Sequence, residues 1–106
     1  MIARLWSART TPALSSSYLD HFRGNVQPEL RKVPGFAGAT VLTRSVPTGT
    51  EILVTTFWQS FEAIDAFAGQ DREAAVVAPE AAALLTDFDR RVRHYEIAVA
   101  DIPAGL

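Results

Sequence analysis

The sequence contains no cysteine, and this absence excludes disulfide bonds, thiolate catalysis and cysteine-bound metal. It also contains no run that approaches the ~20 apolar residues needed to cross a membrane, so we expect no membrane association. The formal net charge is −2 and no basic patch is present, so we expect no nucleic-acid partner. No basic and apolar leader opens the chain, which together with the missing cysteine favours a cytoplasmic location.

What the sequence does contain is typical of a soluble globular protein. Hydrophobic residues make up 48% and charged residues 21% of the 106 residues, which is the usual size of one domain. Periodicity predicts the order strand, helix, strand, strand, helix, strand, which is a ferredoxin-like α+β unit with a four-stranded antiparallel sheet. The expected strands are 1–8, 36–45, 51–58 and 90–99, the later helices are 60–69 and 79–85, and the tail is 101–106.

The first predicted helix begins at Thr11-Pro12, since threonine caps free backbone amides and proline suits the first helical position. Its apolar stripe recurs every four residues, through Leu14, Tyr18, Phe22 and Val26. Gly24 and Pro28 interrupt this pattern, so we expect a kink or a short second piece near residues 25–27.

The third predicted strand is apolar on both of its faces. Ile52, Val54 and Trp58 fall on one face, and Leu53 and Phe57 fall on the other. One face can pack on the helices, but the other needs a cover, because a large bare apolar patch is unusual on a monomer. We therefore predict a homodimer with the sheets packed face to face, and a strand buried on both sides within one chain is the alternative.

No strong catalytic motif is present, and the two histidines are not at metal-ligand spacing, so we expect no metal site. His94 is the first candidate for proton transfer, because histidine titrates near neutral pH and Glu96 shares its strand face. A half-buried structural histidine is the alternative. His21 could edge a pocket or face water.

Aromatic side chains are the candidates for binding a flat ligand. Trp58 ends the third strand, where its indole could stack on a substrate and donate one hydrogen bond. Trp6 has the same potential, and Tyr18 lies one helical turn before Phe22. Ordinary core packing is the alternative for each of these residues.

With these segments, the chain resembles the antibiotic-biosynthesis monooxygenase-like (ABM) family of dimeric α+β barrels. The resemblance covers nearly the whole length. It rests on Val-Pro-Gly-Phe at 33–36, Phe-Trp-Gln-Ser-Phe-Glu-Ala at 57–63, Asp-Phe-Asp at 87–89 and His-Tyr-Glu at 94–96. These motifs specify the fold well and the reaction poorly, since one fold hosts several chemistries.

The resemblance first implies oxidation of an aromatic molecule to a quinone by O₂ without flavin, heme or metal. Trp58 matches the pocket tryptophan of those enzymes, whereas Val54 and Ile64 stand where they carry an asparagine and a tyrosine. Polar groups must then come from elsewhere, and the candidates are His94, Tyr18 and His21.

The resemblance also implies two other activities. Heme-degrading relatives hold iron with a histidine roughly where Val77 stands, and no histidine lies between His21 and His94, so we do not expect heme binding. A non-oxidative, cyclase-like enzyme or a binding protein would suit an apolar, aromatic-lined cavity.

These observations give one functional hypothesis. We predict a cofactor-independent monooxygenase-like enzyme, homodimeric, that acts on a small aromatic or quinol-type molecule, with His94 as the catalytic residue. The residues expected to bind the substrate are Trp6, Tyr18, Phe22, Trp58, Ile64 and Phe67. The alternative is a non-catalytic dimeric protein that binds small apolar ligands, or a cyclase-like enzyme on the same fold.

Overall fold

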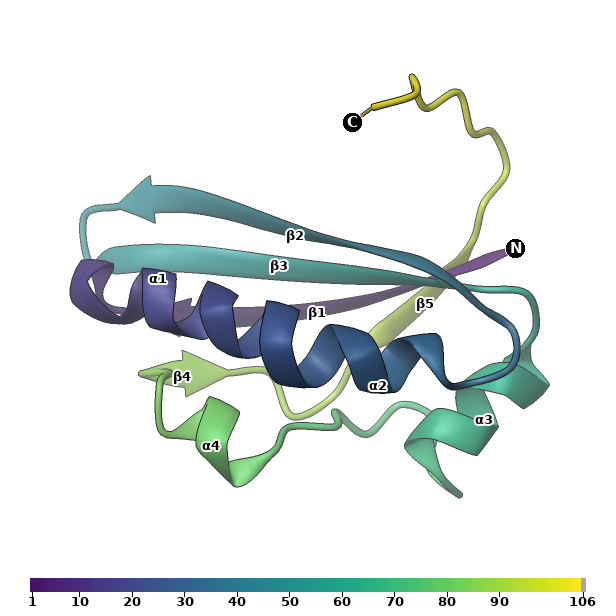
Figure 1. The fold of residues 1–106 in the computed structure, drawn as a ribbon, viewed down its shortest axis with the longest axis horizontal. Helices are drawn as coiled ribbons and strands as arrows, with labels where there is room; N and C mark the ends of the chain where they lie inside the picture. Colours follow the sequence, from purple (N-terminus) through teal and green to yellow (C-terminus); the bar gives the residue numbers. More distant parts are fainter. Residues whose placement is uncertain (106) are drawn as a thin grey trace.

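The computed structural model describes residues 1–105 and confirms the ferredoxin-like α+β fold (Figure 1). A long central hairpin of strands lies beside an interrupted N-terminal helix, and shorter elements follow. In chain order the elements are β1 (Ile2–Thr10), α1 (Pro12–His21), a π-helix η1 (Phe22–Val26), α2 (Gln27–Arg31), β2 (Phe36–Val46), β3 (Gly49–Trp58), α3 (Phe61–Ala68), α4 (Pro79–Ala82), β4 (Asp87–Phe88) and β5 (Arg93–Glu96).

The sheet is antiparallel throughout, in the order β2-β3-β1, with β4 and β5 both paired to β1. The last strand, predicted over 90–99, spans only Arg93–Glu96 as β5, and the two-residue strand β4 before it was not predicted. Between them the chain leaves β1 and turns toward the loop after α3, where the Val92 amide donates to the Glu73 carbonyl at 2.8 Å. Val92 is buried there, and burial of this side chain offsets the missing ladder bonds.

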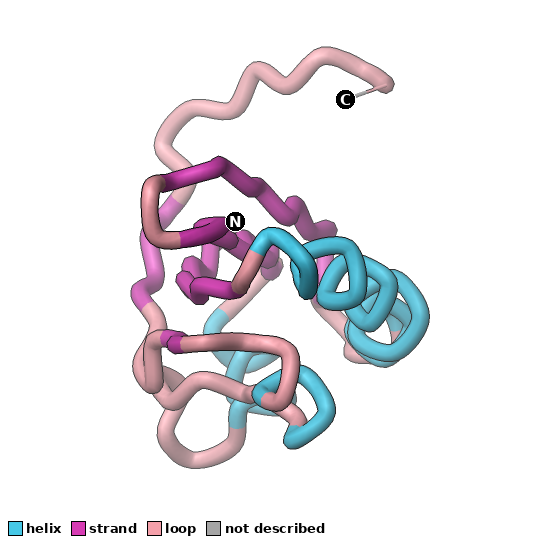
Figure 2. Tube along the Cα trace, turned by 90° about the vertical axis from the view of Figure 1, so that its left-hand side faces the viewer, coloured by secondary structure: helices cyan, strands magenta, loops and turns pink. Residues whose placement is uncertain are grey.

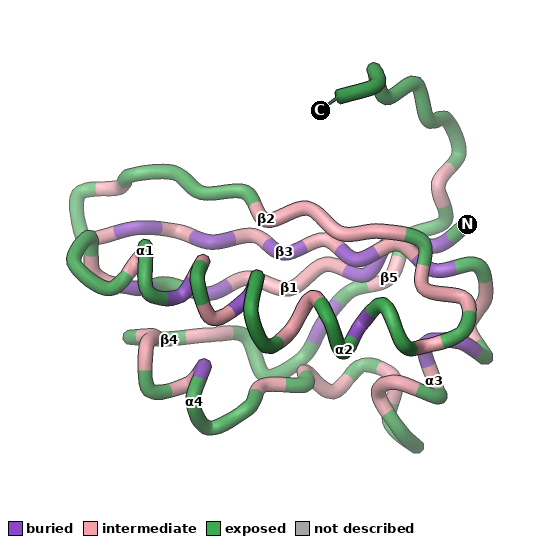
Figure 3. Tube along the Cα trace, viewed as in Figure 1, coloured by how far each residue is buried: buried purple, intermediate pink, exposed green. Residues whose placement is uncertain are grey.

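Helices cover one face of the sheet only, and the C-terminal loop extends away on the other side (Figure 2). Strand β3 alternates accordingly, because successive side chains point to opposite faces (Figure 3). Ile52, Val54 and Trp58 are buried under the helices, whereas Leu53 and Phe57 are only partly covered.

The N-terminal helix forms as expected at its start and in its interruption. The Thr11 hydroxyl accepts a hydrogen bond from the Leu14 amide at 3.2 Å, and Pro12 occupies the first turn. The expected kink is a π-turn in which the Gln27 amide donates to the Phe22 carbonyl, five residues earlier. Leu14 differs from the expectation, because it is exposed and the buried stripe begins at Tyr18.

Outside the sheet and helices the structure is simple. Within residues 1–105, no helix is long and apolar enough to cross a membrane. Residues 101–105 of the expected tail are exposed and have no regular secondary structure, and position 106 lies outside the described residues.

Trp58 is the largest fully buried side chain, so its removal tests the core directly. We expect Trp58→Ala to lower the free energy of unfolding by about 3–5 kcal/mol, since truncation of a buried aromatic loses transfer energy and leaves a cavity. Val99→Ala, at a side chain that is 88% exposed, is the control and should change stability by less than about 0.5 kcal/mol. Urea unfolding measures both, and equal effects would show that Trp58 does not anchor this core.

Candidate functional site

A cavity of about 80 Å³ lies between the sheet and the helical layer. The helix supplies one wall, strands β1 and β3 supply the floor, and the segment after α3 closes the remaining side. Its wall is mostly apolar and is lined by Arg4, Trp6, Tyr18, Phe22, Val26, Leu30, Val54, Thr56, Phe67, Val76, Val77, Ala78, Ala81 and Val92.

Four of the aromatic residues expected to bind a substrate line this cavity, and each comes from a different element, β1, α1, η1 and α3 in turn: Trp6, Tyr18, Phe22 and Phe67. The Trp6 indole packs against the Tyr18 ring with centroids 6.4 Å apart. Its N–H donates to the Asp89 carbonyl at 2.8 Å, so Trp6 presents only its ring to a ligand.

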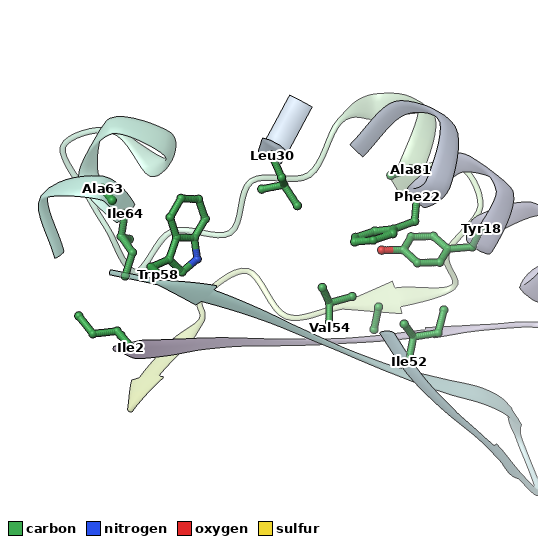
Figure 4. Close-up of a cluster of buried hydrophobic side chains, with 11 residues drawn as sticks. Ile2, Tyr18, Phe22, Leu30, Ile52, Val54, Trp58, Ala63, Ile64 and Ala81 are labelled. Atoms are coloured by element: carbon green, nitrogen blue, oxygen red, sulfur yellow. The ribbon is translucent and has the colours of Figure 1, made fainter. Parts of the chain in front are cut away.

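Trp58 and Ile64 lie beside the cavity and do not line it. Both are fully buried, and they cluster at the opposite end of the core from Tyr18 and Phe22 (Figure 4). The Trp58 N–H donates to the Thr56 hydroxyl at 2.8 Å, and the Trp58 and Phe67 ring centroids are 5.3 Å apart. Trp58 therefore supports two wall residues from behind.

The Tyr18 hydroxyl points toward the centre of the buried cluster (Figure 4). None of residues 1–105 forms a hydrogen bond with it, although the residue is only 3% exposed. Burial raises the pKa of Tyr18 to about 12, so the phenol stays protonated at neutral pH. It can therefore donate a hydrogen bond to a ligand but cannot act as a base.

Arg4 is the charged residue of the cavity wall, and sequence reasoning missed its role. It lies on β1 and is 4% exposed. Its Nη1 donates to the Arg72 carbonyl, its Nη2 donates to the Ala74 carbonyl at 2.8 Å, and its guanidinium lies 5.6 Å from the Phe67 ring centroid. The usable signal was the strand alternation, which put one arginine on the same face as two apolar residues.

His94 faces Arg4 across the β1–β5 pair and does not line the cavity. Its Nε2 lies 3.0 Å from Arg4 Nη1 and must accept the hydrogen bond, because a guanidinium only donates. Burial, and then the positive charge of Arg4, lower the pKa of His94. A neutral His94 thus positions Arg4 from behind the wall.

His21 does not line the cavity either. Its Nδ1 lies 3.2 Å from the Asn25 amide nitrogen, and its Nε2 is buried without a hydrogen-bond partner among the described residues. No cluster of three metal-ligating side chains occurs within residues 1–105.

The fold and this cavity define a ferredoxin-like protein with an aromatic internal site. Comparison of the sequence with family models identifies the family. The model of the antibiotic biosynthesis monooxygenase family matches residues 1–79. The chain therefore belongs to this family. No curated protein matches the sequence significantly.

Solved structures agree on the fold. A putative antibiotic biosynthesis monooxygenase from Bacillus cereus superposes with a TM-score of 0.65 at 19% identity, covering 96% of this chain and 97% of its own. A monooxygenase from the ActVA-Orf6 gene of Streptomyces coelicolor, in complex with nanaomycin D, gives 0.62 at 21% identity over 97% and 92%. The heme-degrader MhuD from Mycobacterium tuberculosis, with two hemes bound in its active site, gives 0.59 at 22% identity over 97% and 100%.

The residues of the cavity do not fit heme. No histidine or cysteine lines the wall, Val77 is part of it, and the Tyr18 phenol remains protonated, so an axial ligand for the iron is lacking.

The contact between Arg4 and His94 predicts a pH-dependent stability. The pKa of His94 is lowered from its ordinary value of 6.5, so below that pH the unfolded chain binds a proton that the folded chain does not. Stability should therefore fall as the pH drops through this window and rise as the pH increases.

His94→Gln tests this prediction, because glutamine can accept the Arg4 hydrogen bond and does not titrate. Urea unfolding between roughly pH 5 and pH 8 should show a weaker pH dependence in the variant than in the wild type. Identical pH dependence would show that Arg4 does not hold His94 in its neutral form.

Proposed function

We propose that this protein is a cofactor-independent monooxygenase that oxidises a small aromatic or quinol-type molecule in the cavity beneath the helix. The observation that supports this function most directly is the composition of the wall, in which aromatic rings surround two polar groups, Arg4 and Tyr18. A few polar groups in an apolar cavity are typical of small-molecule sites. The monooxygenase relative in complex with nanaomycin D supports an aromatic ligand.

In the proposed reaction a ring C–H of a phenolic substrate becomes a carbonyl. One oxygen atom of O₂ enters the ring, the other leaves as water, and the substrate supplies all the electrons. The protein supplies a dry aromatic cavity that holds the ring and a donor for the developing negative charge on oxygen. Tyr18 provides that donor, since its hydroxyl is protonated and has no partner within the described chain.

We assign His94 a positioning role in this reaction rather than contact with the substrate. It lies behind Arg4, and its Nε2 is occupied by the Arg4 hydrogen bond. A role in proton transfer through direct contact, as expected from the sequence, would require this bond to break.

Substrate entry requires the cavity to widen. An engineered cavity of about 150 Å³ holds one benzene molecule, and the cavity described above is about half that size. The wall formed by Val76, Val77 and Ala78 is the side that can move, because this segment has no regular secondary structure and Val76 is 52% exposed.

Tyr18→Phe tests the proposed function. With an active aromatic quinol, we expect turnover to fall by about a hundredfold, the lower end of the effect of removing one donor to an oxyanion. Stability should change little, because the hydroxyl has no described protein partner. The assay is O₂ uptake with isotopically labelled O₂, which must deliver one labelled atom into the quinone product.

Tyr95→Phe is the matched control, since it also removes only a phenol hydroxyl and keeps the ring, and Tyr95 lies on β5 away from the cavity. Equal loss of turnover in both variants, or retention in both, would remove Tyr18 from the mechanism. If no quinol in a broad panel consumes O₂ but several bind, the chain is the non-catalytic binding protein instead.

We also propose that the chain forms a homodimer through the open face of the sheet. The strand register places Leu42 opposite Leu53, and Phe57 and Tyr95 opposite Ala3, all on the face that no helix covers. Leu42 and Tyr95 are 53% and 54% exposed. An apolar face of this kind favours a partner with the same face. One domain over residues 1–106 and a cytoplasmic location stay predictions from the sequence.

Leu53→Asp tests the dimer. We expect it to convert the dimer to a folded monomer in analytical ultracentrifugation, because a charge at the interface would be desolvated without a partner. Ser16→Asp, at an exposed position on α1, adds the same charge elsewhere and should leave the dimer intact. A dimeric Leu53→Asp variant, or a monomeric wild type, would contradict this arrangement.

A further inference from the structure

We propose that Arg4 makes this cavity selective for aromatic ligands in their oxyanion form, so that the phenolic substrate binds as its phenolate against the guanidinium. This inference rests on the proposed function, because it names the ionisation state of the ligand in that same cavity. It is carried by the hydrogen bonds, charge and burial of Arg4.

The hydrogen bonds of Arg4 leave two of its donors available. A guanidinium has five N–H groups. The two on Nη1 are directed at the Arg72 carbonyl and at His94, and one on Nη2 is donated to the Ala74 carbonyl. The Nε–H and the second Nη2–H remain. Among the described residues, the one fully buried side-chain N or O atom without a hydrogen-bond partner is His21 Nε2. The Arg4 Nε atom also has no partner but does not share that burial, so part of its surface is open.

The same two nitrogens bind an anion elsewhere in this chain. Arg72 donates from Nε to one Asp65 carboxylate oxygen at 2.9 Å and from Nη2 to the other at 2.8 Å. This edge of a guanidinium matches flat, delocalised oxyanions. Arg4 thus keeps one N–H on each of these two nitrogens, while Nη1 and the other N–H of Nη2 fasten it to the protein.

The charge of Arg4 has no counterion within the described chain. No carboxylate of residues 1–105 lies within 4.0 Å of the Arg4 guanidinium. The ion pairs that do form among these residues involve exposed or half-exposed groups. Two carbonyls, a neutral imidazole and an aromatic face solvate the cation, but they do not neutralise it. Buried charges are normally paired, so an anionic ligand would complete this site.

Its position also fits the assignment. Arg4 belongs to the cavity wall together with the aromatic side chains and the Tyr18 hydroxyl. An aromatic ring held by those side chains would lie in a wall that offers two donors for its oxygen, Arg4 and Tyr18. The surrounding apolar wall strengthens a charge pair relative to water.

4-Nitrophenol tests the inference, because its phenol and phenolate have different absorption spectra. Titration of the bound probe between roughly pH 5 and pH 9 gives its apparent pKa in the site. We expect the wild type to lower that pKa by about one relative to free solution, which is a tenfold preference for the phenolate. 4-Nitroanisole, which cannot ionise, should bind at least tenfold more weakly than the phenolate.

Arg4→Met removes the charge and keeps an apolar stem of similar length. In this variant the pKa of the bound probe should equal or exceed its value in water, because an apolar cavity disfavours the charged form. Arg4→Lys retains charge and should lower the pKa less than wild type does, since lysine lacks the two-nitrogen edge. If Arg4→Met does not fold, the wild-type titration and the lysine variant decide the question.

The outcomes separate this inference from the proposed function. A bound probe whose pKa is unchanged or raised in the wild type would overturn the oxyanion site and leave the aromatic cavity standing. Failure of the probe to bind anywhere would remove both. A lowered pKa that persists in Arg4→Met would assign the selectivity to another group and overturn the role of Arg4.

Discussion

The buried guanidinium of Arg4 is the interaction on which the organisation of this domain depends. From one strand position it contacts three parts of the chain: the segment around Arg72 and Ala74, strand β5 at His94, and helix α3 at Phe67. Backbone hydrogen bonds from Val92 to Glu73 and from Ala75 to Arg90 hold the segment after α3 on its outer side, and Arg4 holds it on the cavity side. Because it is fastened there, the cavity has a wall on the side away from the helix.

Much of the fold was predictable because alternation and periodicity are local properties of the chain. The β3 pattern and the Thr11 cap were sufficient to place those elements. The start of the last strand was not predictable, because Val92 turns away from β1 to meet the Glu73 carbonyl just before β5 begins. That hydrogen bond joins residues from different elements, and residue spacing carries no information about it.

The sequence pattern anticipates some of the residues that line the cavity and not others. Tyr18 and Phe67 lie on the core-facing side of their helices, so the apolar pattern was sufficient to select them as residues of the cavity wall. Whether a buried aromatic borders a void or fills one depends on the packing around it, and Trp58 fills one. Arg4 was overlooked because a single arginine in a strand usually points to solvent, and only the tertiary structure shows its carbonyl partners.

The π-turn of the first helix has a consequence for how this cavity can change. Residues spaced by four drift around a regular α-helix by about 40° at each step, since four residues exceed one full turn. The wider turn at Phe22–Val26 offsets that drift and lets Tyr18 and Leu30 face the same space. One surplus residue thus shapes the wall without involving the sheet. Its loss would rotate the half of the helix that carries Leu30 against the half that carries Tyr18, so a one-residue change in helix length would reshape the cavity wall.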